Sequence, residues 1–571
     1  MDHSYFKFPK ADWQRRYEAL RASFLERIPA GAVALRFGYK KAYVYLLRHL
    51  FKTDKLDFAE PLPEGKAARW RVSREIREKI CTARRANLSA GEIAQILSEE
   101  DVEISVRTVE RVLAEEGFPK LPRRARLKMG ITVKGAAVPK RAEALSLSSL
   151  DGQDFESDCA GALLFAPFLA QMDFSGTVRD AGLPGTSAIP ALSHVLSLLA
   201  LKLLGDERYA HVGEHGFGRG LGLFAGLNVL PKCTSMSTYS FGLDAVHIER
   251  LQKAFIRRAS NLGLYGGAIV NLDFHTVPHF GEESALESHW AGARNKTMKG
   301  ALTLIAQDAE SKLMLYTDAD IRRFEADDQV LDFLSFWRKV RRGINPTLIF
   351  DSRFTTYPKL SKLNVANVKF VTLRRRGEKM IDAVGDLDGW QRIHIPHDKR
   401  KFPNPLVHVS TISLQGYDGH LRQVIVRGNG HEKPTFLISN DFDTEVELLV
   451  GNYARRWRVE NVIAEAVKFF HLNAISSPIL LKVHFDLALT MIADTLYTML
   501  ARRLRGFEDC DAPKLYRHFV RGKASVSVRG REVTVIFPRR AHNPVLRAVE
   551  WDNLPSRLLT PDSAKLKFRF M

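Results

Sequence analysis

Two aspartates in the middle of the chain could bind a metal ion, because each follows a short apolar run. Asp273 follows residues 267–272 and Asp351 follows residues 346–350, and both runs have the composition of buried strands. Ligands of an open α/β sheet bind beyond the carboxyl ends of its strands, and Mg²⁺ and Mn²⁺ prefer oxygen donors. Aspartate also ends strands as an ordinary turn residue, and this alternative is the more common one for either aspartate alone.

A third carboxylate lies in a segment with a more specific pattern. Residues 452–472 predict a helix in which Tyr453, Arg456 and Glu460 recur at i, i+3 and i+7, on one face. Arg456 could keep Glu460 ionised and oriented through its charge and its hydrogen bonds. The alternative is a charged surface helix with ordinary i, i+4 pairs. The pattern therefore predicts a site for metal ions and phosphates.

The segment around Glu460 resembles a motif of DDE insertion-sequence transposases, which have a ribonuclease-H-like core. The similarity is to the subgroup with a Y-x2-R-x3-E-x6-K signature, and it rests on Tyr453, Arg456, Trp457 and Glu460. Trp457 is expected to pack in the fold, and stacking on a base is the alternative. The subgroup also carries a β-rich insertion before its last catalytic helix.

The resemblance implies that Asp273, Asp351 and Glu460 are the catalytic carboxylates of a two-metal site. Asp273 would bridge two ions, Mg²⁺ or Mn²⁺, and Asp351 and Glu460 would each hold one. Two such ions can activate the attacking oxygen and stabilise the leaving oxygen in a displacement at phosphorus. Tyr453 and Arg456 would position DNA phosphates.

One position departs from the family pattern. The lysine that should follow the glutamate by seven residues is Val467 here, and Lys468 comes one residue later. One residue turns a side chain by about 100° on a regular helix, so either a bulge or the long side chain restores the DNA contact expected of Lys468, or that contact is missing. His471 comes eighteen residues after Tyr453, a spacing that places it back on the catalytic face of a regular helix. His275 could touch the metal shell or be a plain strand histidine.

Two segments near the N-terminus have the pattern of helix-turn-helix units. Residues 30–51 predict two helices joined by a turn, and residues 72–117 repeat the arrangement. Ser89 and Glu92 have capping-box spacing, and Ser105 can cap the last helix. An ordinary helical hairpin with a solvated basic face is the alternative. If the last helix enters the major groove of DNA, three of its side chains face the bases: Arg107, Thr108 and Arg111.

The composition favours a partner that is a polyanion. The 571 residues include 85 Lys+Arg and 65 Asp+Glu, a net charge of +20. Cations that neutralise phosphates release counterions, which favours double-stranded DNA, although RNA-binding and membrane-surface proteins are also basic. The four cysteines lie far apart, which argues against a structural zinc site and fits a reducing compartment. We therefore expect a cytoplasmic protein, associated with the nucleoid as a DNA-binding protein would be. Charged residues interrupt the most apolar runs, so no membrane partner is expected.

The expected organisation is a multidomain α+β protein. Residues 120–141 are expected to form an extended basic linker. The expected parts are a helix-turn-helix DNA-binding region (1–130), a helical linker and DNA-binding or dimerisation region (131–265), a mixed α/β catalytic core in two parts (266–364 and 450–508), a β-rich insertion (365–449) and a C-terminal β-hairpin region (509–571).

These patterns together predict a DNA transposase. It would bind transposon ends, cleave phosphodiester bonds and join the 3′ ends to target DNA, as a homodimer in the synaptic complex. Two alternatives remain open at this point: a catalytically inactive, transposase-derived DNA-binding regulator, and a metal-dependent DNA nuclease on the same core.

Overall fold

The chain forms two compact units, Met1–Lys79 and Ile80–Met571. The computed structural model describes residues 11–53, 56, 72–85, 88–118, 141–215, 218–280, 286–292, 295–341, 343–354, 356–395, 402–474, 479–560 and 563–571. Nearly all of the expected basic linker, residues 119–140, therefore lies outside the described residues.

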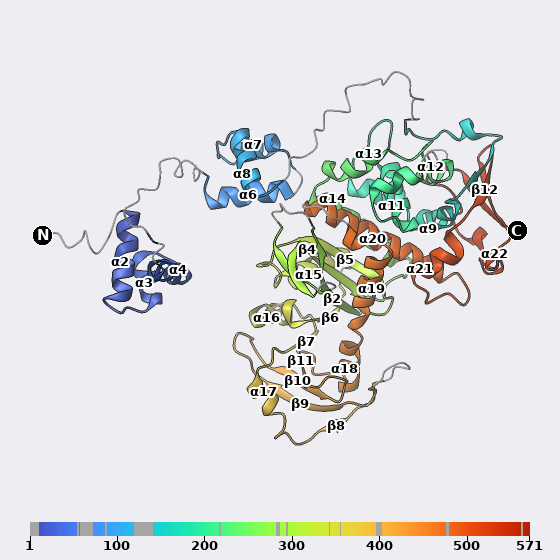
Figure 1. Ribbon diagram of the computed structural model, residues 1–571. Helices are drawn as coiled ribbons and strands as arrows, with labels where there is room; N and C mark the ends of the chain where they lie inside the picture. The colour runs from blue at the N-terminus through green and yellow to red at the C-terminus, as the bar shows by residue number, and fades with distance from the viewer. Residues whose placement is uncertain are drawn as a thin grey trace. The chain divides into compact units, whose positions relative to one another are not determined.

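Residues 11–53, the main described part of the first unit, form the helices α2 (Asp12–Phe24), α3 (Ala30–Phe37) and α4 (Lys41–Lys52) (Figure 1). Small and branched side chains from all three form its core, including Ala19, Val33 and Val44. The two helices expected over residues 30–51 are confirmed. Gly38 separates them in the left-handed conformation, which is the usual way for glycine to end a helix.

The second unit begins within α6 (Arg74–Arg85), which α7 (Ala90–Glu99) and α8 (Val106–Glu115) follow. The capping box is present: the Glu92 amide donates to Ser89 Oγ over 3.3 Å, and the Ser89 amide donates to the Glu92 carboxylate over 2.7 Å. Each bond satisfies an amide that the helix itself leaves unpaired. The helix starts expected from these residues are confirmed.

A mixed ten-stranded sheet forms the centre of the second unit, with β5 paired to β4 beside the main order β3-β4-β2-β6-β7-β11-β10-β9-β8. β2 is antiparallel to β4 and parallel to β6, and β6 is parallel to β7. The strands are β2 (Ile269–Pro278), β3 (Ser288–Ala291), β4 (Lys296–Asp308), β5 (Met314–Ile321), β6 (Thr347–Phe350), β7 (Phe370–Leu373), β8 (Gln391–Arg392), β9 (Leu406–Ile412), β10 (Leu421–Arg427) and β11 (Thr435–Ser439). The β-rich character expected of residues 365–449 is thus confirmed, and these strands continue the central sheet.

Helices pack along this sheet, and the most buried of them is α20 (Leu480–Ala501), which lies against β5 (Figure 1). α18 and α19 connect the β-rich strands to α20. The other helices of this part are α14 (Ala245–Asn261), α15 (Gln329–Val340), α16 (Tyr357–Val365), α17 (Glu378–Asp382), α18 (Val446–Ala454) and α19 (Trp457–Lys468).

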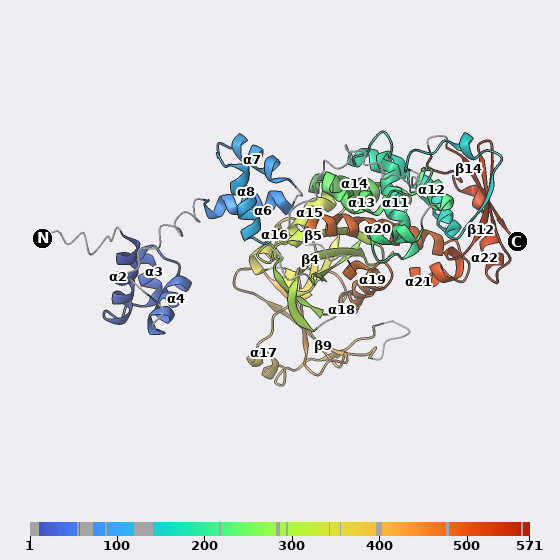
Figure 2. The same cartoon turned by 45° about the horizontal axis from the view of Figure 1, so that its top comes forward.

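A second sheet joins the C-terminal region to residues 154–157. Its order is β1-β12-β13-β14, and β1 pairs antiparallel with β12 (Figure 2). Its strands are β1 (Asp154–Ser157), β12 (Ala524–Arg529), β13 (Glu532–Phe537) and β14 (Lys565–Phe570). The hairpin expected over residues 524–537 is confirmed. The helices between β1 and β2 include α9 (Ala166–Gln171), α10 (Phe174–Ala181), α11 (Ala191–Leu204), α12 (Arg219–Ala225) and α13 (Cys233–Thr238), and α21 (Ala512–Leu515) and α22 (Asn543–Arg547) flank the C-terminal strands.

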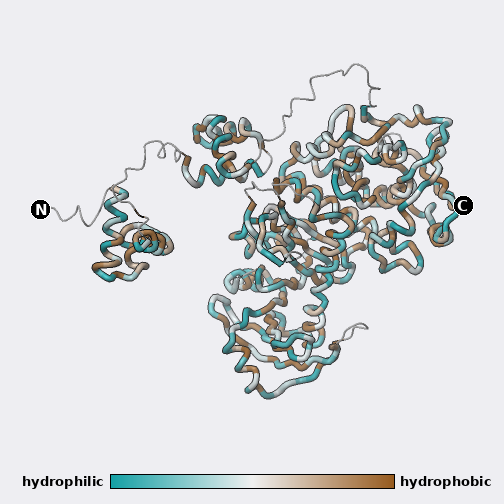
Figure 3. The backbone as a smooth tube through the Cα atoms, in the orientation of Figure 1, coloured by the Kyte–Doolittle hydropathy of each residue, from teal (hydrophilic) through white to brown (hydrophobic). Residues whose placement is uncertain are grey.

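Hydrophobic residues are distributed through every folded part of the chain (Figure 3). Among the described residues, no helix has both the length and the apolar character needed to cross a membrane. The two most apolar segments form α11 and α20, which are buried in the protein as expected.

Two expectations about local structure are wrong. β2 continues past Asp273 to Pro278, because β4 goes on pairing with it after the parallel partner β6 has ended. The helix expected over residues 452–472 is broken at Arg455 and Arg456, where the amide of Arg456 donates to the carbonyl of Tyr453, three residues back. Such i→i+3 bonds tighten the backbone at helix ends.

Candidate active site

Asp273 lies in β2, and Asp351 directly follows the neighbouring parallel strand β6. Asn271 in β2 pairs with Ile349 in β6, so Asp273 and Asp351 both follow this pair by two residues. Adjacent strands are about 4.8 Å apart, and the sheet therefore brings the two aspartates to the same edge region. Asp351 directly follows β6, as expected, and its Oδ1 accepts a hydrogen bond of 3.0 Å from Ser352 Oγ.

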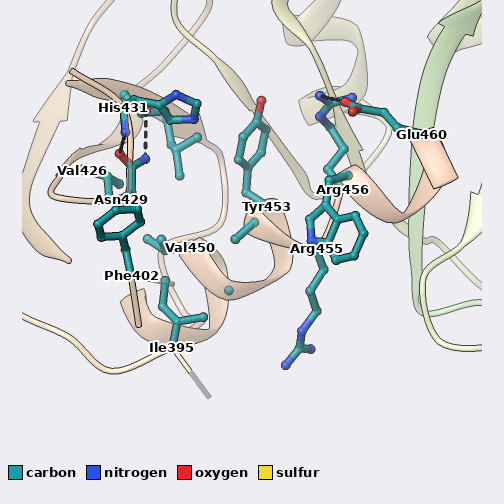
Figure 4. A pocket seen from close by; sticks show the side chains of 15 residues that line it. Ile395, Phe402, Val426, Asn429, His431, Val450, Tyr453, Arg455, Arg456 and Glu460 are labelled. Atoms are coloured by element: carbon teal, nitrogen blue, oxygen red, sulfur yellow. Dashed lines mark hydrogen bonds and ion pairs between the residues drawn. The ribbon is translucent and has the colours of Figure 1, made fainter. Parts of the chain in front are cut away.

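Arg456 joins carboxylates from two different elements. Its Nη1 lies 3.0 Å from Asp273 Oδ2, and its Nη2 lies 3.0 Å from Glu460 Oε1. Figure 4 shows the Arg456 guanidinium directed at Glu460, with the neighbouring Arg455 pointing away from both. Strand β2 and helix α19 are thereby held together at Asp273 and Glu460, two of the three carboxylates that the sequence predicts for the site.

Burial is uneven across this arrangement. The side chains of Arg456 and Asp273 are 16% and 19% exposed, whereas that of Glu460 is 57% exposed. Burial and the nearby Glu460 charge raise the pKa of Asp273, although Arg456 and the Phe274 amide oppose the shift. The negative charge of Asp273 is thus only partly compensated by its protein neighbours, and a cation next to it would be stabilised.

Tyr453 and Asp351 share the electrostatic environment of Arg456. Burial raises the pKa of Tyr453 to about 12. The charge of Arg456 lowers this pKa, and that of Asp351 raises it. Burial alone lowers the pKa of Arg456, but Asp273, Tyr453, Glu460 and Asp351 raise it. Tyr453 therefore keeps its proton at neutral pH and can donate a hydrogen bond, and Arg456 remains a cation.

No protein-family model matches the chain, and no curated protein matches it.

The three carboxylates are brought together without forming a closed set of metal ligands. Among the described residues, no group of three or more His, Cys, Asp or Glu side chains is arranged to hold a metal ion. Arg456 occupies one oxygen of Asp273 and one of Glu460. The remaining carboxylate oxygens are donors of the type that hard divalent ions prefer.

A pocket of about 630 Å³ opens beside Tyr453 and Glu460, between the β-rich strands and helices α18 and α19 (Figure 4). Trp457 lines it and is 47% exposed, so the expectation that this side chain packs in the interior is wrong. The sequence did not identify the side chains that the loops and strand ends of the β-rich region contribute to this pocket; the glycines at 428 and 430, typical of a turn, are a local sign of the loop that carries Asn429 and His431. These side chains include Ile395, Phe402, Asn429, His431 and Thr435.

The other side chains expected near the carboxylates, Lys468, His471 and His275, have different surroundings. Lys468 is exposed at the last position of α19, and no hydrogen bond or ion pair of the described residues involves it. His471 lies beyond the helix end in a left-handed conformation and pairs with the Gly205 carbonyl over 2.9 Å, so its expected place on the catalytic face is wrong. His275 is hydrogen-bonded to Asn473 Oδ1 over 2.8 Å, as an ordinary strand histidine would be.

The side chains expected to face DNA from α8 differ in how available they are. Arg107 is exposed, and Arg111 is exposed beside Glu115 at 3.9 Å. Thr108 Oγ1 lies 2.8 Å from Ser105 Oγ, so this hydroxyl takes part in the helix cap. Arg107 and Arg111 are thus the more available of the three.

The first unit contains a cationic helix that the sequence reasoning did not single out. Residues 40–52 carry four lysines and arginines and no acidic residue, and that run is the signal that could have identified it. Arg48 and Lys52 lie over the Phe24 ring at 5.4 and 5.9 Å. Lys40 and Lys41 are exposed near Tyr45, which is itself 52% exposed. This surface combines positive charge with an aromatic side chain, a combination suited to nucleic acid.

Proposed function

We propose that this protein is a DNA transposase that cleaves transposon ends and joins their 3′ ends to target DNA. The observation that carries the proposal is the bridge from Arg456 to Asp273 and Glu460, beside Asp351 on the adjacent strand. It assembles, from three separate segments, the residues that resemble the catalytic carboxylates of DDE transposases. The strand arrangement, with β2 central between antiparallel β4 and parallel β6, supports a ribonuclease-H-like core.

The donor set fits two divalent ions in its chemistry. Asp273, Asp351 and Glu460 offer only carboxylate oxygens, and burial leaves the charge of Asp273 poorly compensated. These three residues would hold Mg²⁺ or Mn²⁺. When bound, such ions would activate the attacking oxygen and stabilise the leaving oxygen at phosphorus.

The chain's own cations and donors would position the DNA backbone. Arg456 is held in place by two carboxylates, and a guanidinium fixed in this way presents its remaining N–H groups in a defined direction. The Tyr453 hydroxyl, which keeps its proton, can donate to a phosphate oxygen. Lys468, exposed at the end of α19, would contact DNA further from the reacting phosphate.

Recognition of the element ends would fall to the N-terminal helices, as helix-turn-helix units. Arg107 and Arg111 on α8 and the cationic helix α4 offer two surfaces for duplex DNA. Phosphate contacts set the position of a protein on DNA, whereas base contacts set its sequence preference. Two ends must be held together for joining, which favours a homodimer in the synaptic complex.

The test is a cleavage assay on labelled duplexes that carry the DNA flanking the gene. Wild-type protein with Mg²⁺ is expected to release the 3′ end, and Asp273→Ala, Asp351→Ala and Glu460→Ala are expected to lower the rate at least about 1,000-fold. Glu447→Ala, at an exposed glutamate of α18, is the matched control and should cleave at the wild-type rate.

The alternatives give different outcomes in the same assay. Cleavage without later joining would indicate a metal-dependent nuclease on this core. Binding of the ends without cleavage would indicate an inactive DNA-binding regulator. Cleavage by all three alanine variants at the wild-type rate would refute the carboxylate assignment.

A further inference from the structure

Away from the carboxylate site, a cysteine, a histidine and an aspartate form one hydrogen-bonded chain. Cys159 Sγ lies 3.4 Å from His215 Nδ1, and His215 Nε2 lies 2.6 Å from Asp206 Oδ2. The His215 and Asp206 side chains are 15% and 16% exposed, and Cys159 is half-buried. The order is that of a nucleophile, a base and the acid that orients the base.

The backbone fixes Asp206 and His215 at the two ends of one loop. Gly205 ends α11 in the left-handed conformation, and the Asp206 amide donates to the Leu201 carbonyl over 3.0 Å. His471 Nε2 approaches the Gly205 carbonyl at 2.9 Å from the segment that follows α19. The backbone of Asp206 is therefore fixed at the end of α11, and His215, nine residues later in the chain, contacts the Asp206 side chain.

Cys159 is held equally firmly on the other side. Its amide donates to Ser157 Oγ over 3.3 Å. Two residues later, a Cβ at Gly161 would stand 1.8 Å from the Val520 carbonyl oxygen, so only glycine allows this close approach. These two contacts fix the backbone from which the Cys159 thiol projects toward His215.

The charges around the thiol favour an imidazolium at His215. Its hydrogen bonds to Asp206 and then to Cys159 raise the pKa of His215 to about 10, although burial opposes the shift. Both ring nitrogens then donate, one to the carboxylate and one to the sulfur. Tyr516 also interacts electrostatically with Cys159 and Asp206, and Asp158, next to Cys159 in the chain, pairs with Lys523 over 3.3 Å.

We propose that Cys159 is a reactive thiol that hydrogen peroxide, or a peroxide of similar size, oxidises in preference to the other cysteines. The sulfur attacks one peroxide oxygen, the O–O bond breaks, and sulfenic acid forms. The hydroxide that leaves takes the proton from His215 Nδ1 and departs as water. Sulfur is oxidised and the peroxide oxygens are reduced, so no further reactant is needed. A small, uncharged oxidant suits a half-buried thiol.

This inference does not depend on the proposed DNA chemistry. Cys159, His215 and Asp206 share no residue with the carboxylate site, and the test needs neither DNA nor metal. Failure of the transposase assay would leave this inference standing, and the reverse is equally true.

The test measures oxidation of each cysteine in the full-length protein. Purified protein receives substoichiometric hydrogen peroxide, dimedone traps sulfenic acid, and mass spectrometry quantifies the adduct at each cysteine. Cys233 and Cys510 have the same half-buried exposure as Cys159 and serve as internal comparators. Adduct at Cys159 is expected to form at least about 10-fold faster than at either comparator, because His215 lies next to its sulfur and can supply a proton to the leaving oxygen.

Two variants separate activation from simple exposure. His215→Asn and Asp206→Asn, the second of which keeps a hydrogen-bond acceptor, should each lower the Cys159 rate at least about 10-fold while Cys233 and Cys510 stay unchanged. Should His215→Asn alter all the cysteines by disturbing the fold, Asp206→Asn decides. Equal rates at the three cysteines in wild-type protein, or an unchanged Cys159 rate in Asp206→Asn, would overturn the proposal.

Discussion

At the scale of single residues, Arg456 is the side chain on which the candidate active site depends most. It reaches Asp273 and Glu460 with two different nitrogens at 3.0 Å each, which only a forked guanidinium can do. Arg456→Lys keeps the charge but can reach one carboxylate at a time. The expected loss in end cleavage is about 10- to 100-fold, the equivalent of one charge-assisted hydrogen bond.

The control for this prediction is the preceding arginine. Arg455 points away from Glu460 in Figure 4, so Arg455→Lys should cleave within about 2-fold of wild type. Single-turnover cleavage rates for the two variants make the comparison. Equal losses in both would show that the bridge of Arg456 has no special role.

The pair of His215 and Asp206 gives stability a defined pH dependence. The pKa of His215 is raised from 6.5 to about 10, so the pair contributes fully below pH 6.5, where the unfolded chain is also protonated. The contribution then falls as pH rises and is lost above about pH 10. The difference in thermal midpoint between wild type and Asp206→Asn, measured from about pH 5 to 10.5, should shrink along this course. A difference that grows with pH would contradict the assigned charges.

The sequence was informative about some of these residues because the relevant spacing is local. Arg456 is the N-cap residue of α19, four residues before Glu460, and their contact follows from that spacing. Asp273 meets Arg456 across 183 positions, a pairing that depends on how β2 and α19 pack. His471 could not be placed because the helix ends before it, at Lys468.

At the scale of elements, a buried ion pair joins α11 to α20. Lys202 Nζ lies 2.6 Å from Asp486 Oδ2 and 2.8 Å from the Phe470 carbonyl, and Tyr209 donates to Asp486 Oδ1 over 2.6 Å. Lys202→Met leaves the Asp486 charge without its cation, and the expected loss in unfolding free energy is about 3–5 kcal/mol. Urea denaturation followed by tryptophan fluorescence measures it.

A surface pair provides the matched comparison. Lys567 and Glu532 are 2.7 Å apart with side chains 43% and 39% exposed, so Lys567→Met should cost less than about 1 kcal/mol. A similar cost at both lysines would mean that burial does not govern the α11–α20 pair.

Local sequence patterns predicted which helices and strands form better than which of them pack or pair with one another. The alternation of residues 524–537 around Arg529 and Gly530 predicts the β12–β13 hairpin, which the structure contains. β1 is only four residues long and pairs with β12, which comes near the other end of the chain, so no local pattern predicts it. The same holds for β2, whose extension to Pro278 depends on a partner that follows later in the sequence.

At the scale of the whole molecule, the net charge of +20 predicts DNA binding that weakens steeply with salt. The exposed Lys40 and Lys41 of the α4 region are the clearest candidates for phosphate contacts in the first unit. Replacing both with glutamine should lower the slope of log affinity against log salt by about 2. Fluorescence anisotropy with a labelled duplex at several salt concentrations gives this slope.

A lysine outside the proposed DNA surface controls for the loss of charge alone. Lys567→Gln removes one positive charge that Glu532 already balances, so the salt slope should stay within about 0.3 of wild type. An unchanged slope in the Lys40 and Lys41 variant would exclude these two residues from the interface.

The most direct test of the central claim is joining of a labelled 3′ end to a supercoiled plasmid in Mg²⁺. The ends are those that flank the gene, and wild-type protein is compared with Glu460→Gln, which keeps the size of the side chain and removes its charge. The predicted result is joined product with wild-type protein and a loss of at least about 1,000-fold with Glu460→Gln. Joining by Glu460→Gln at the wild-type rate would contradict the account.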